Sequence, residues 1–219
     1  MFRIKICGLT HVVEAVAAAR AGADAIGLNF YPKSRRFIQL DHARQIVEAL
    51  PSEVVKVGLF VNASAADICR TFDQLGLDLI QLHGDEPATF LAQLGDRPVM
   101  RAFRLGESGL ESIARYLGDC RQLGCMPKLV LVDAHVKGAY GGTGQVADWQ
   151  ALKQYPLDAS VPPLVLAGGL TPGNVAEAIR TVRPAAVDTA SGVEAVPGRK
   201  SDVLVRRFVA AAAEAFKDQ

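Results

Sequence analysis

The sequence predicts a single (β/α)8 barrel, a closed ring of eight parallel strands in which each strand is followed by a helix. Three observations lead to this prediction. Strand-like runs that are apolar on both faces alternate with helix-like stretches along the chain. The alternation repeats eight times in 219 residues, the size of such a barrel without large insertions. The chain lacks a G-x-G-x-x-G turn after its first strand-like run, and open doubly wound sheets usually have fewer strands and need a switch point.

The predicted strands are runs of aliphatic and β-branched residues, mostly apolar on both faces, as in parallel strands that are covered on both sides. Gly and Pro residues are scattered between these runs as turn punctuation and mark no interdomain linker. In chain order, the predicted strands are Arg3–Cys7, Ala25–Phe30, Val54–Val61, Leu77–Leu82, Val99–Phe103, Leu129–Val132, Leu164–Ala167 and Ala186–Thr189.

A helix-like stretch follows every predicted strand, and the sixth of these stretches has the weakest helical pattern. In chain order, the predicted helices are Val12–Arg20, Leu40–Ala49, Ala65–Leu75, Pro87–Leu94, Gly109–Leu117, Trp149–Gln154, Pro172–Thr181 and Asp202–Phe216. Boundary residues support these helices. Asp41 can cap the second helix, and Thr171 followed by Pro172 predicts the start of the seventh. Gly76 and Gly95 stand where C-terminal caps are expected.

The composition fits one globular domain over residues 1–219. Half of the residues are hydrophobic and the formal net charge is +1, so the chain carries no electrostatic footprint for nucleic acid. The first residues have a strand pattern rather than that of a signal peptide, and no apolar run reaches the roughly 18 residues of a membrane helix. We therefore expect a soluble, cytoplasmic protein without membrane or nucleic-acid partners. The four cysteines lack a zinc-site spacing and are expected to be free thiols, with no metal bound.

Two residues that can move protons stand at strand ends. Cys7 closes the first strand-like run, and Asp133 closes the run Lys128–Asp133. In a closed barrel both would lie at the carboxyl-terminal mouth, where barrel enzymes carry out their chemistry. A thiolate base and a carboxylic acid facing one substrate suit a proton-moving reaction. The residues alone leave the alternatives open, because a free Cys is most often a small buried hydrophobe and Asp133 can be a loop cap.

Small residues follow the last two strands. Gly168 and Gly169 come after the seventh strand, and Ser191 and Gly192 come after the eighth. Barrels frequently bind phosphate with the loops at these two positions, because glycines let the backbone approach a ligand closely. Ordinary tight turns are the alternative for either pair by itself. Their joint occurrence favours a phosphate site.

Lys5 has the same strand parity as Cys7, so both side chains are expected to point into the barrel. An inward Lys could form a Schiff base. It could also be held in an ion pair inside the barrel, with Asp188 as one possible partner. His83, at the end of the fourth strand, could line the mouth or cap the next helix, and the sequence does not separate these alternatives.

Two loops have more than one interpretation. The segment Val136–Gly144 is long and Gly-rich, which suits either a flexible connection or a lid that excludes water from the site. The basic run Lys33–Arg36 follows the second strand. By its spacing alone it is best interpreted as a solvated loop.

Several motifs together resemble one enzyme family, phosphoribosylanthranilate isomerase, from the first strand almost to the last helix. Each motif is modestly specific, and the set in this order is highly specific. The motifs are Lys5–Thr10 (KICGLT), Phe30–Arg36 (FYPKSRR), Gly58–Asn62 (GLFVN), Leu79–Gly84 (LIQLHG), Gly141–Gly144 (GGTG), Leu166–Leu170 (LAGGL) and Ser191–Glu194 (SGVE).

The resemblance implies a (β/α)8 TIM barrel that catalyses an Amadori rearrangement in tryptophan biosynthesis without a metal or organic cofactor. The implied substrate is N-(5-phosphoribosyl)anthranilate and the implied product is 1-(2-carboxyphenylamino)-1-deoxyribulose 5-phosphate. By resemblance, Cys7 is the general base, Asp133 is the general acid and Arg36 meets the anthranilate carboxylate. Arg35 stays a solvated residue. The phosphate loops and Arg36 at opposite rims would hold the substrate across Cys7 and Asp133.

Other functions give different expectations. The isomerase of the analogous rearrangement in histidine biosynthesis would have an Asp where this chain has Cys7. A Schiff-base aldolase would use Lys5 as its nucleophile. A barrel that only binds phosphorylated ligands would not need both Cys7 and Asp133. The expected partner is a small phosphorylated substrate, and the chain is expected to be a monomer or a homodimer.

Overall fold

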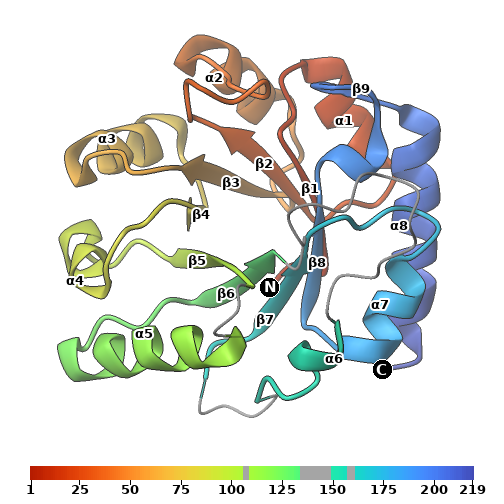
Figure 1. Ribbon diagram of the computed structural model, residues 1–219. Helices are drawn as coiled ribbons and strands as arrows, with labels where there is room; N and C mark the ends of the chain where they lie inside the picture. Colours follow the sequence, from red (N-terminus) through yellow and green to blue (C-terminus); the bar gives the residue numbers. More distant parts are fainter. Residues whose placement is uncertain (106–108, 134–148, 157–160) are drawn as a thin grey trace.

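The computed structural model describes residues 1–105, 109–133, 149–156 and 161–219. Its centre is a closed barrel of eight parallel strands joined in chain order, so that the first strand pairs with the eighth. Helices surround the strands (Figure 1). The predicted (β/α)8 architecture is therefore confirmed.

The strands are short, and most of their residues are buried because each strand has the barrel interior on one side and helices on the other. Their bounds are β1 (Ile4–Cys7), β2 (Ala25–Asn29), β3 (Val55–Phe60), β4 (Leu79–Leu82), β5 (Val99–Arg104), β6 (Leu129–Asp133), β7 (Leu164–Ala167) and β8 (Ala186–Thr189). All eight predicted strands exist. β7 and β8 have the predicted bounds, the other strands differ by one or two residues at one or both ends, and Asp133 ends β6 as expected.

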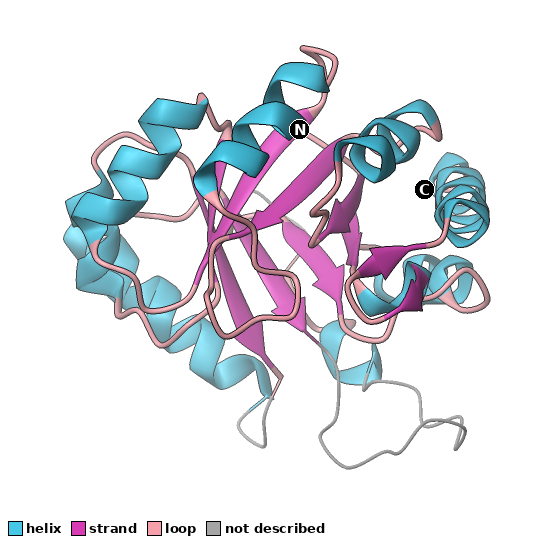
Figure 2. Ribbon diagram, turned by 90° about the horizontal axis from the view of Figure 1, so that it is seen from above, coloured by secondary structure: helices cyan, strands magenta, loops and turns pink. Residues whose placement is uncertain are grey.

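The helices form the outer layer that is seen from above in Figure 2. Their bounds are α1 (Val12–Arg20), α2 (Leu40–Ala49), α3 (Ala65–Leu75), α4 (Ala88–Leu91), α5 (Gly109–Leu123), α6 (Trp149–Leu152), α7 (Val175–Val182) and α8 (Asp202–Lys217). Two 3-10 turns, η1 (Ala92–Leu94) and η2 (Ser191–Val193), complete the helical segments. A short hairpin of β9 (Glu194–Val196) and β10 (Arg199–Lys200), which is not among the strands that the sequence predicts, follows β8.

The structure corrects three predicted helix boundaries. Asp41 lies inside the first turn of α2 rather than capping it, where its charge still suits the helix dipole. Before α7, the Thr171 backbone N–H donates to Asn174 Oδ1 at 2.7 Å. This turn delays the helix to Val175. The helix α5 continues to Leu123, and Gly124 ends it with a φ of 67°.

Two apolar layers make the core. Alternate strand residues fill the barrel interior, among them Val57, Leu79, Met100 and Leu131. The residues between them point outward and pack against the helices. This alternation follows from the two-residue period of a strand. It also decides which residues at the strand ends face the mouth.

A buried ion pair crosses the pairing of β1 with β8. Lys5 Nζ lies 2.9 Å from Asp188 Oδ1, and Lys5 has no solvent exposure. Burial by itself lowers the pKa of Lys5, but Asp188 and Cys7 outweigh it, so the pKa is raised above its usual value. The predicted ion-pair partner is therefore confirmed. An ammonium held in this way is a poor amine nucleophile, which argues against a Schiff-base aldolase.

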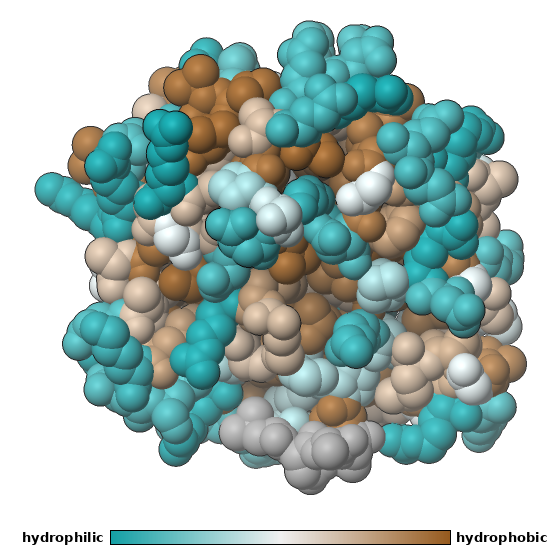
Figure 3. All heavy atoms as spheres, turned by 180° about the vertical axis from the view of Figure 1, so that it is seen from behind, coloured by the Kyte–Doolittle hydropathy of each residue, from teal (hydrophilic) through white to brown (hydrophobic). Residues whose placement is uncertain are grey.

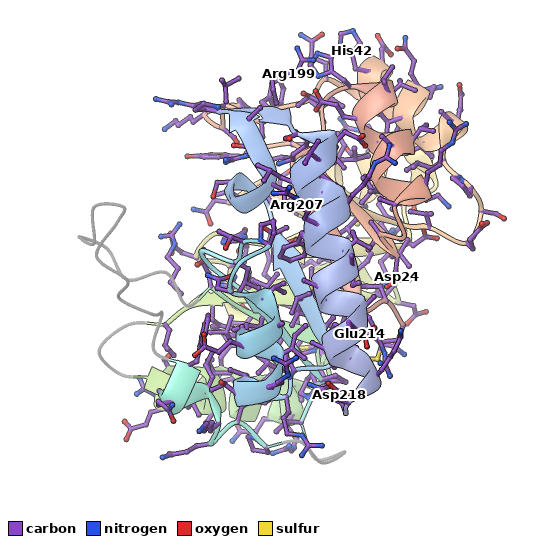
Figure 4. The ribbon with its side chains drawn as sticks, turned by 90° about the vertical axis from the view of Figure 1, so that its right-hand side faces the viewer. Asp24, His42, Arg199, Arg207, Glu214 and Asp218 are labelled. Atoms are coloured by element: carbon purple, nitrogen blue, oxygen red, sulfur yellow. The ribbon has the colours of Figure 1, made fainter. Side chains whose placement is uncertain are left out.

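The two ends of the barrel can be followed in Figure 4. Arg199 of the hairpin and His42 of α2 lie at one end, and Asp24, just before β2, lies toward the other. The strands run from the Asp24 end to the Arg199 end, so the hairpin stands beside the mouth. The face seen in Figure 3 mixes hydrophilic and hydrophobic side chains. In the part of the chain that is described, no helix has the length and apolar character to span a bilayer.

Candidate active site

A cavity of about 630 Å³ opens at the carboxyl-terminal ends of the strands. It is lined by side chains from strand ends and by the loops that follow them. The lining residues are Cys7, Asn29, Tyr31, Ser34, Arg35, Arg36, Leu59, Val61, Gln81, His83, Arg104, Asp133, Ala167, Gly168, Gly169, Leu170, Asp188, Thr189, Ala190 and Ser191. Cys7, Asp133, Arg36, Gly168, Gly169 and Ser191, which the sequence singled out, are thus brought together.

Cys7 is the last residue of β1 and is buried in the cavity wall. A Cβ on Gly27 would come within 2.7 Å of Cys7 Sγ and 3.0 Å of Lys5 Nζ. The thiol and the ammonium therefore both lie next to Gly27. Burial raises the pKa of Cys7 above its usual value, whereas Lys5 and Lys200 act in the opposite direction. The thiol is therefore placed to exchange a proton beside two buried cations.

Asp133 ends β6 and is half-buried. Its position in the sheet is fixed by pairing with Arg104 of β5 and Ala167 of β7. Its backbone carbonyl also accepts a hydrogen bond from the Leu105 N–H at 3.1 Å. The carboxyl group thus stands on a rigid strand end rather than on a loop, which suits a residue that must meet a reacting atom.

His83 lines the cavity and does not cap the next helix, because Pro87 occupies the position before α4. Its Nδ1 lies 3.0 Å from Gln81 Nε2. Burial lowers the pKa of His83, and Asp133 acts in the opposite direction. Burial therefore favours the neutral form of the ring, and the question that the sequence left open is settled in favour of the mouth.

Arg36 is placed by the loop that leaves β2. Ser34 Oγ accepts hydrogen bonds from Asn29 Nδ2 at 3.1 Å and from the Arg36 backbone N–H at 3.0 Å. Gly8, with a φ of 74°, passes beneath the arginine, and a Cβ on Gly8 would overlap Arg36 Cδ. The glycine of the KICG motif is therefore needed to give the Arg36 side chain its room.

The carboxylate of Glu194 binds the guanidinium of Arg36. Nε donates to Glu194 Oε1 at 2.6 Å and Nη2 donates to Glu194 Oε2 at 2.7 Å. Lys200 Nζ donates to the same Oε1 at 2.9 Å and to the carbonyl oxygen of Ala190 at 2.9 Å. The side chains of Glu194 and Lys200 are 5% and 2% exposed. The hairpin that follows β8 thus carries a buried cluster that holds Arg36.

The loops after β7 and β8 meet at the cavity. Gly168 and Gly169 have φ values of 95° and 66°, a backbone path that residues with a side chain rarely adopt. Ser191 lines the cavity, whereas Gly192 lies just behind it, where a Cβ would overlap the carbonyl oxygen of Leu170. Gly192 thus lets the two loops approach each other closely.

The order of these groups around the rim differs from the sequence-based expectation in one respect. Arg36 was expected opposite the phosphate loops. The structure places only β1 between β2 and β8, and the hairpin after β8 touches Arg36. Cys7 on β1 therefore stands between Arg36 and the loop that contains Ser191. The Gly-rich loop Val136–Gly144, considered as a lid, lies outside the described residues.

Sequence reasoning missed several residues of this site. Glu194 and Lys200 were not singled out, although Glu194 ends the SGVE motif next to a predicted phosphate loop. Asn29, Gln81 and Arg104 were also missed. Each of these three is a polar residue of inward parity near the end of an apolar strand, which is a signal that could have found them.

A closed parallel barrel with a thiol, a carboxyl group and an arginine around one mouth defines a (β/α)8-barrel enzyme. The sequence model of N-(5'-phosphoribosyl)anthranilate (PRA) isomerase matches residues 4–211 of this chain. A relative named N-(5'-phosphoribosyl)anthranilate isomerase, from Pseudomonas aeruginosa (strain UCBPP-PA14), is 46% identical over 219 residues, which cover 99% of this chain and 98% of the relative.

Solved structures agree with the sequence comparison. Phosphoribosyl anthranilate isomerase from Thermotoga maritima superposes with a TM-score of 0.85 at 38% identity, covering 98% of this chain and all of that one. A structure of the isomerase in complex with reduced 1-(o-carboxyphenylamino)-1-deoxyribulose 5-phosphate has a TM-score of 0.82 at 35% identity, with 98% and 100% coverage. The chain belongs to the N-(5'-phosphoribosyl)anthranilate isomerase family, the isomerases of tryptophan biosynthesis.

The buried cluster around Glu194 gives a prediction for stability in acid. Burial acts to raise the pKa of Glu194, but the hydrogen bonds from Arg36 and Lys200 outweigh it and lower the pKa from 4.5 to about 2. A depressed carboxyl pKa contributes stability above the unfolded-state pKa, and this contribution is lost as the pH falls toward the folded-state pKa. Between about pH 5 and pH 3, this group alone should remove about 2 kcal/mol from the free energy of unfolding.

Urea unfolding of the wild-type protein and of Glu194→Gln at several pH values would measure this contribution. The variant should lack this part of the acid slope, whereas a change at the exposed Glu48 to Gln should keep it. Equal acid slopes for the wild type and Glu194→Gln would show that the carboxylate of Glu194 is not stabilised by its cationic neighbours.

Proposed function

We propose that this chain converts N-(5-phosphoribosyl)anthranilate into 1-(2-carboxyphenylamino)-1-deoxyribulose 5-phosphate, with Asp133 as general acid and Cys7 as general base. The observation that carries the proposal is that one cavity contains both groups together with Arg36 and the loops after β7 and β8. An acid, a base and two anion-binding groups match a substrate that has a phosphate and a carboxylate at its ends.

The order of the strands suggests how the substrate lies. Asp133 on β6 and Cys7 on β1 flank the β7 and β8 loops on either side. A phosphate bound by those loops, at Gly168, Gly169, Ser191 and the adjoining Gly192, would put the ribose between acid and base. The anthranilate ring would then extend past Cys7 toward β2 and Arg36.

The chemistry uses one proton donor and one proton acceptor. Asp133 protonates the ring oxygen of the ribose, the C1–O bond breaks, and the nitrogen lone pair forms the C=N bond of a Schiff base. The positive nitrogen acidifies the C2 proton, which the Cys7 thiolate removes to give an enolamine. The enolamine tautomerises to the aminoketose. Because the substrate brings its own nitrogen, the reaction needs neither a lysine imine nor an organic cofactor.

Among the described residues, Arg36 has donors left for the substrate carboxylate. A guanidinium carries five N–H groups, and Glu194 uses one on Nε and one on Nη2. The edge formed by Nη1 and the second N–H of Nη2 can give a carboxylate two parallel hydrogen bonds. A lysine could not copy this geometry, because its ammonium is a point charge.

Replacing Arg36 should therefore weaken substrate binding selectively. We expect Arg36→Ala to cost roughly 1.5–3 kcal/mol in binding, the range of a charge-assisted hydrogen bond, and Arg36→Lys to cost less. Arg35→Ala should be much milder, because Arg35, although it borders the cavity, is exposed to solvent. The measurement compares dissociation constants for the reduced product analogue and for the same compound without its carboxylate. Equal weakening of both ligands by Arg36→Ala would assign Arg36 a general electrostatic role instead.

The direct test of the proposed function is a turnover assay. Because the substrate is labile, an added anthranilate phosphoribosyltransferase generates it in the cuvette from phosphoribosyl pyrophosphate and anthranilate, with release of pyrophosphate. The anthranilate fluorescence of the substrate is then followed after the protein is added. Rapid loss of fluorescence that depends on the protein supports the proposal. Binding of the product analogue without any turnover would instead support a barrel that only binds phosphorylated ligands.

A further inference from the structure

We propose that Glu194 is a positioning residue, which locks the guanidinium of Arg36 so that one edge of it is presented to the ring carboxylate of the substrate. Lys200 holds Glu194 in turn. This inference rests on the proposed function and deepens it, because it assigns part of the specificity for the carboxylate to the hairpin of β9 and β10.

The first argument is geometric. The two contacts of 2.6 Å and 2.7 Å engage the side of the guanidinium that contains Nε and Nη2. A carboxylate bound there in the bidentate mode fixes the plane of the guanidinium as well as its distance. The edge formed by Nη1 and the second N–H of Nη2 is then fixed as well. An Arg side chain held in advance loses less rotamer freedom when it binds a ligand, which strengthens binding.

The second argument concerns charge. Arg36 and Lys200 are both cations, and Glu194 lies between them with a hydrogen bond to each. The cluster therefore keeps one net positive charge, which matches one carboxylate. Without Glu194, two cations would face each other beside Cys7, and their repulsion would move Arg36 away from its position.

The third argument is that Lys200 connects the two ends of the binding site. Its Nζ contacts both Glu194 and the carbonyl oxygen of Ala190, the residue before Ser191. The buried ammonium of Lys200 therefore contacts both the carboxylate that binds Arg36 and the loop after β8. Its pKa is lowered by burial, and Glu194 works against that shift.

If this cluster only supported the hairpin, any change that loosens the hairpin should have the same effect as a change at Glu194. The hairpin is also tied to α1 by Glu14, which accepts hydrogen bonds from Arg199 Nε at 2.6 Å and from the Lys200 backbone N–H at 3.2 Å. Within the described residues, Glu14 makes no hydrogen bond to Arg36, so Glu14→Gln loosens the hairpin without removing a partner from the guanidinium. It serves as the matched control.

The experiment measures inhibition constants of two reduced product analogues, with and without the ring carboxylate, together with KM and kcat for the substrate. For Glu194→Gln, we expect the carboxylate analogue to bind about tenfold more weakly and KM to rise similarly. Binding of the analogue without the carboxylate should change less than twofold, and kcat should fall less than threefold. Glu14→Gln should leave the ratio of the two inhibition constants unchanged.

Two further variants keep the inference falsifiable if Glu194→Gln does not fold. Glu194→Asp keeps the charge but shortens the reach, and it should give an intermediate loss for the carboxylate analogue. In an Arg36→Ala background, either change at Glu194 should have no additional effect on that ligand, because there is no guanidinium left to position.

The outcomes are distinguishable. If the wild type prefers the carboxylate analogue and the Glu194 variants keep the full preference, Glu194 is not a positioning residue and the proposed function stands. If Glu194→Gln and Glu14→Gln weaken both analogues equally, the cluster only supports the hairpin and the inference is overturned. If the wild type does not prefer the carboxylate analogue at all, the inference and the proposed substrate fail together.

Discussion

Replacing Cys7 by alanine should lower kcat by roughly 10²–10⁴-fold and leave substrate affinity nearly unchanged, because a positioned base contributes about that factor to a proton transfer. Cys7 is buried at the end of β1 and faces the same point as the ammonium of Lys5. The change removes a sulfur atom from the cavity wall and leaves the groups proposed to bind the anionic ends of the substrate in place. Steady-state kinetics with the substrate generated in the assay, and titration with the reduced product analogue, measure the two quantities.

The dependence of the wild-type turnover rate on pH offers a second measurement of the role of Cys7. Since burial raises the pKa of the thiol, the thiolate fraction and the rate should increase with pH through the neutral and into the alkaline range. The variant Cys7→Asp carries a base with a lower ordinary pKa, so its rate should rise at lower pH. A Cys7→Ala protein with near-normal turnover would remove Cys7 from the mechanism.

Replacing Asp133 by asparagine should also reduce kcat by roughly 10²–10⁴-fold. Asparagine has nearly the same shape, so the end of β6 and its pairing with β5 and β7 should be retained. What is lost is a group that can donate a proton to the ring oxygen and take one back. The dissociation constant of the reduced product analogue should change much less than kcat.

Competition by inorganic phosphate separates this role from a binding role. Asp133→Asn should leave the inhibition constant of phosphate unchanged, because the loops proposed to bind phosphate follow β7 and β8 rather than β6. If weaker phosphate affinity were the main defect, Asp133 would belong to the binding site and another group would have to protonate the ribose. His83, which faces the same cavity, would be the next residue to test.

The alternation of apolar strands with helices was sufficient to predict the barrel, because every strand is buried on both sides and therefore stands out from its surroundings. Helix ends were harder to predict. The α7 boundary depends on a side-chain contact between Asn174 and the Thr171 backbone, and such competition between turn and helix is decided locally by hydrogen bonds. The β9–β10 hairpin consists of short, mostly polar strands, which give no apolar period.

The candidate site was partly predictable for the same reason. Strand-end positions such as Cys7 and Asp133 can be counted along the sequence, since the carboxyl ends of all eight strands meet at one mouth. The pairing of Lys5 with Asp188 was one of the possibilities that strand parity and the closure of the barrel allowed. The pairing of Arg36 with Glu194 was not among them, because it joins two loops whose paths are set by Gly8 and by the hairpin rather than by strand period.

The ion pair of Lys5 and Asp188 also marks where the chain closes on itself. These residues are 183 positions apart, whereas every other neighbouring pair of barrel strands is consecutive in the chain. Among the neighbouring barrel strands, the β1–β8 pair therefore spans the longest stretch of chain, and a contact of such long range has the largest entropic cost of loop closure. The chain ends already meet there, since Arg3 Nη1 donates to the carbonyl oxygen of Phe216 at 3.1 Å. A circular permutant, joined at these ends and opened between two other strands, would keep the same strand pairings. In that permutant β8 and β1 would be consecutive in the chain, and the long-range pairing would lie at the new opening instead.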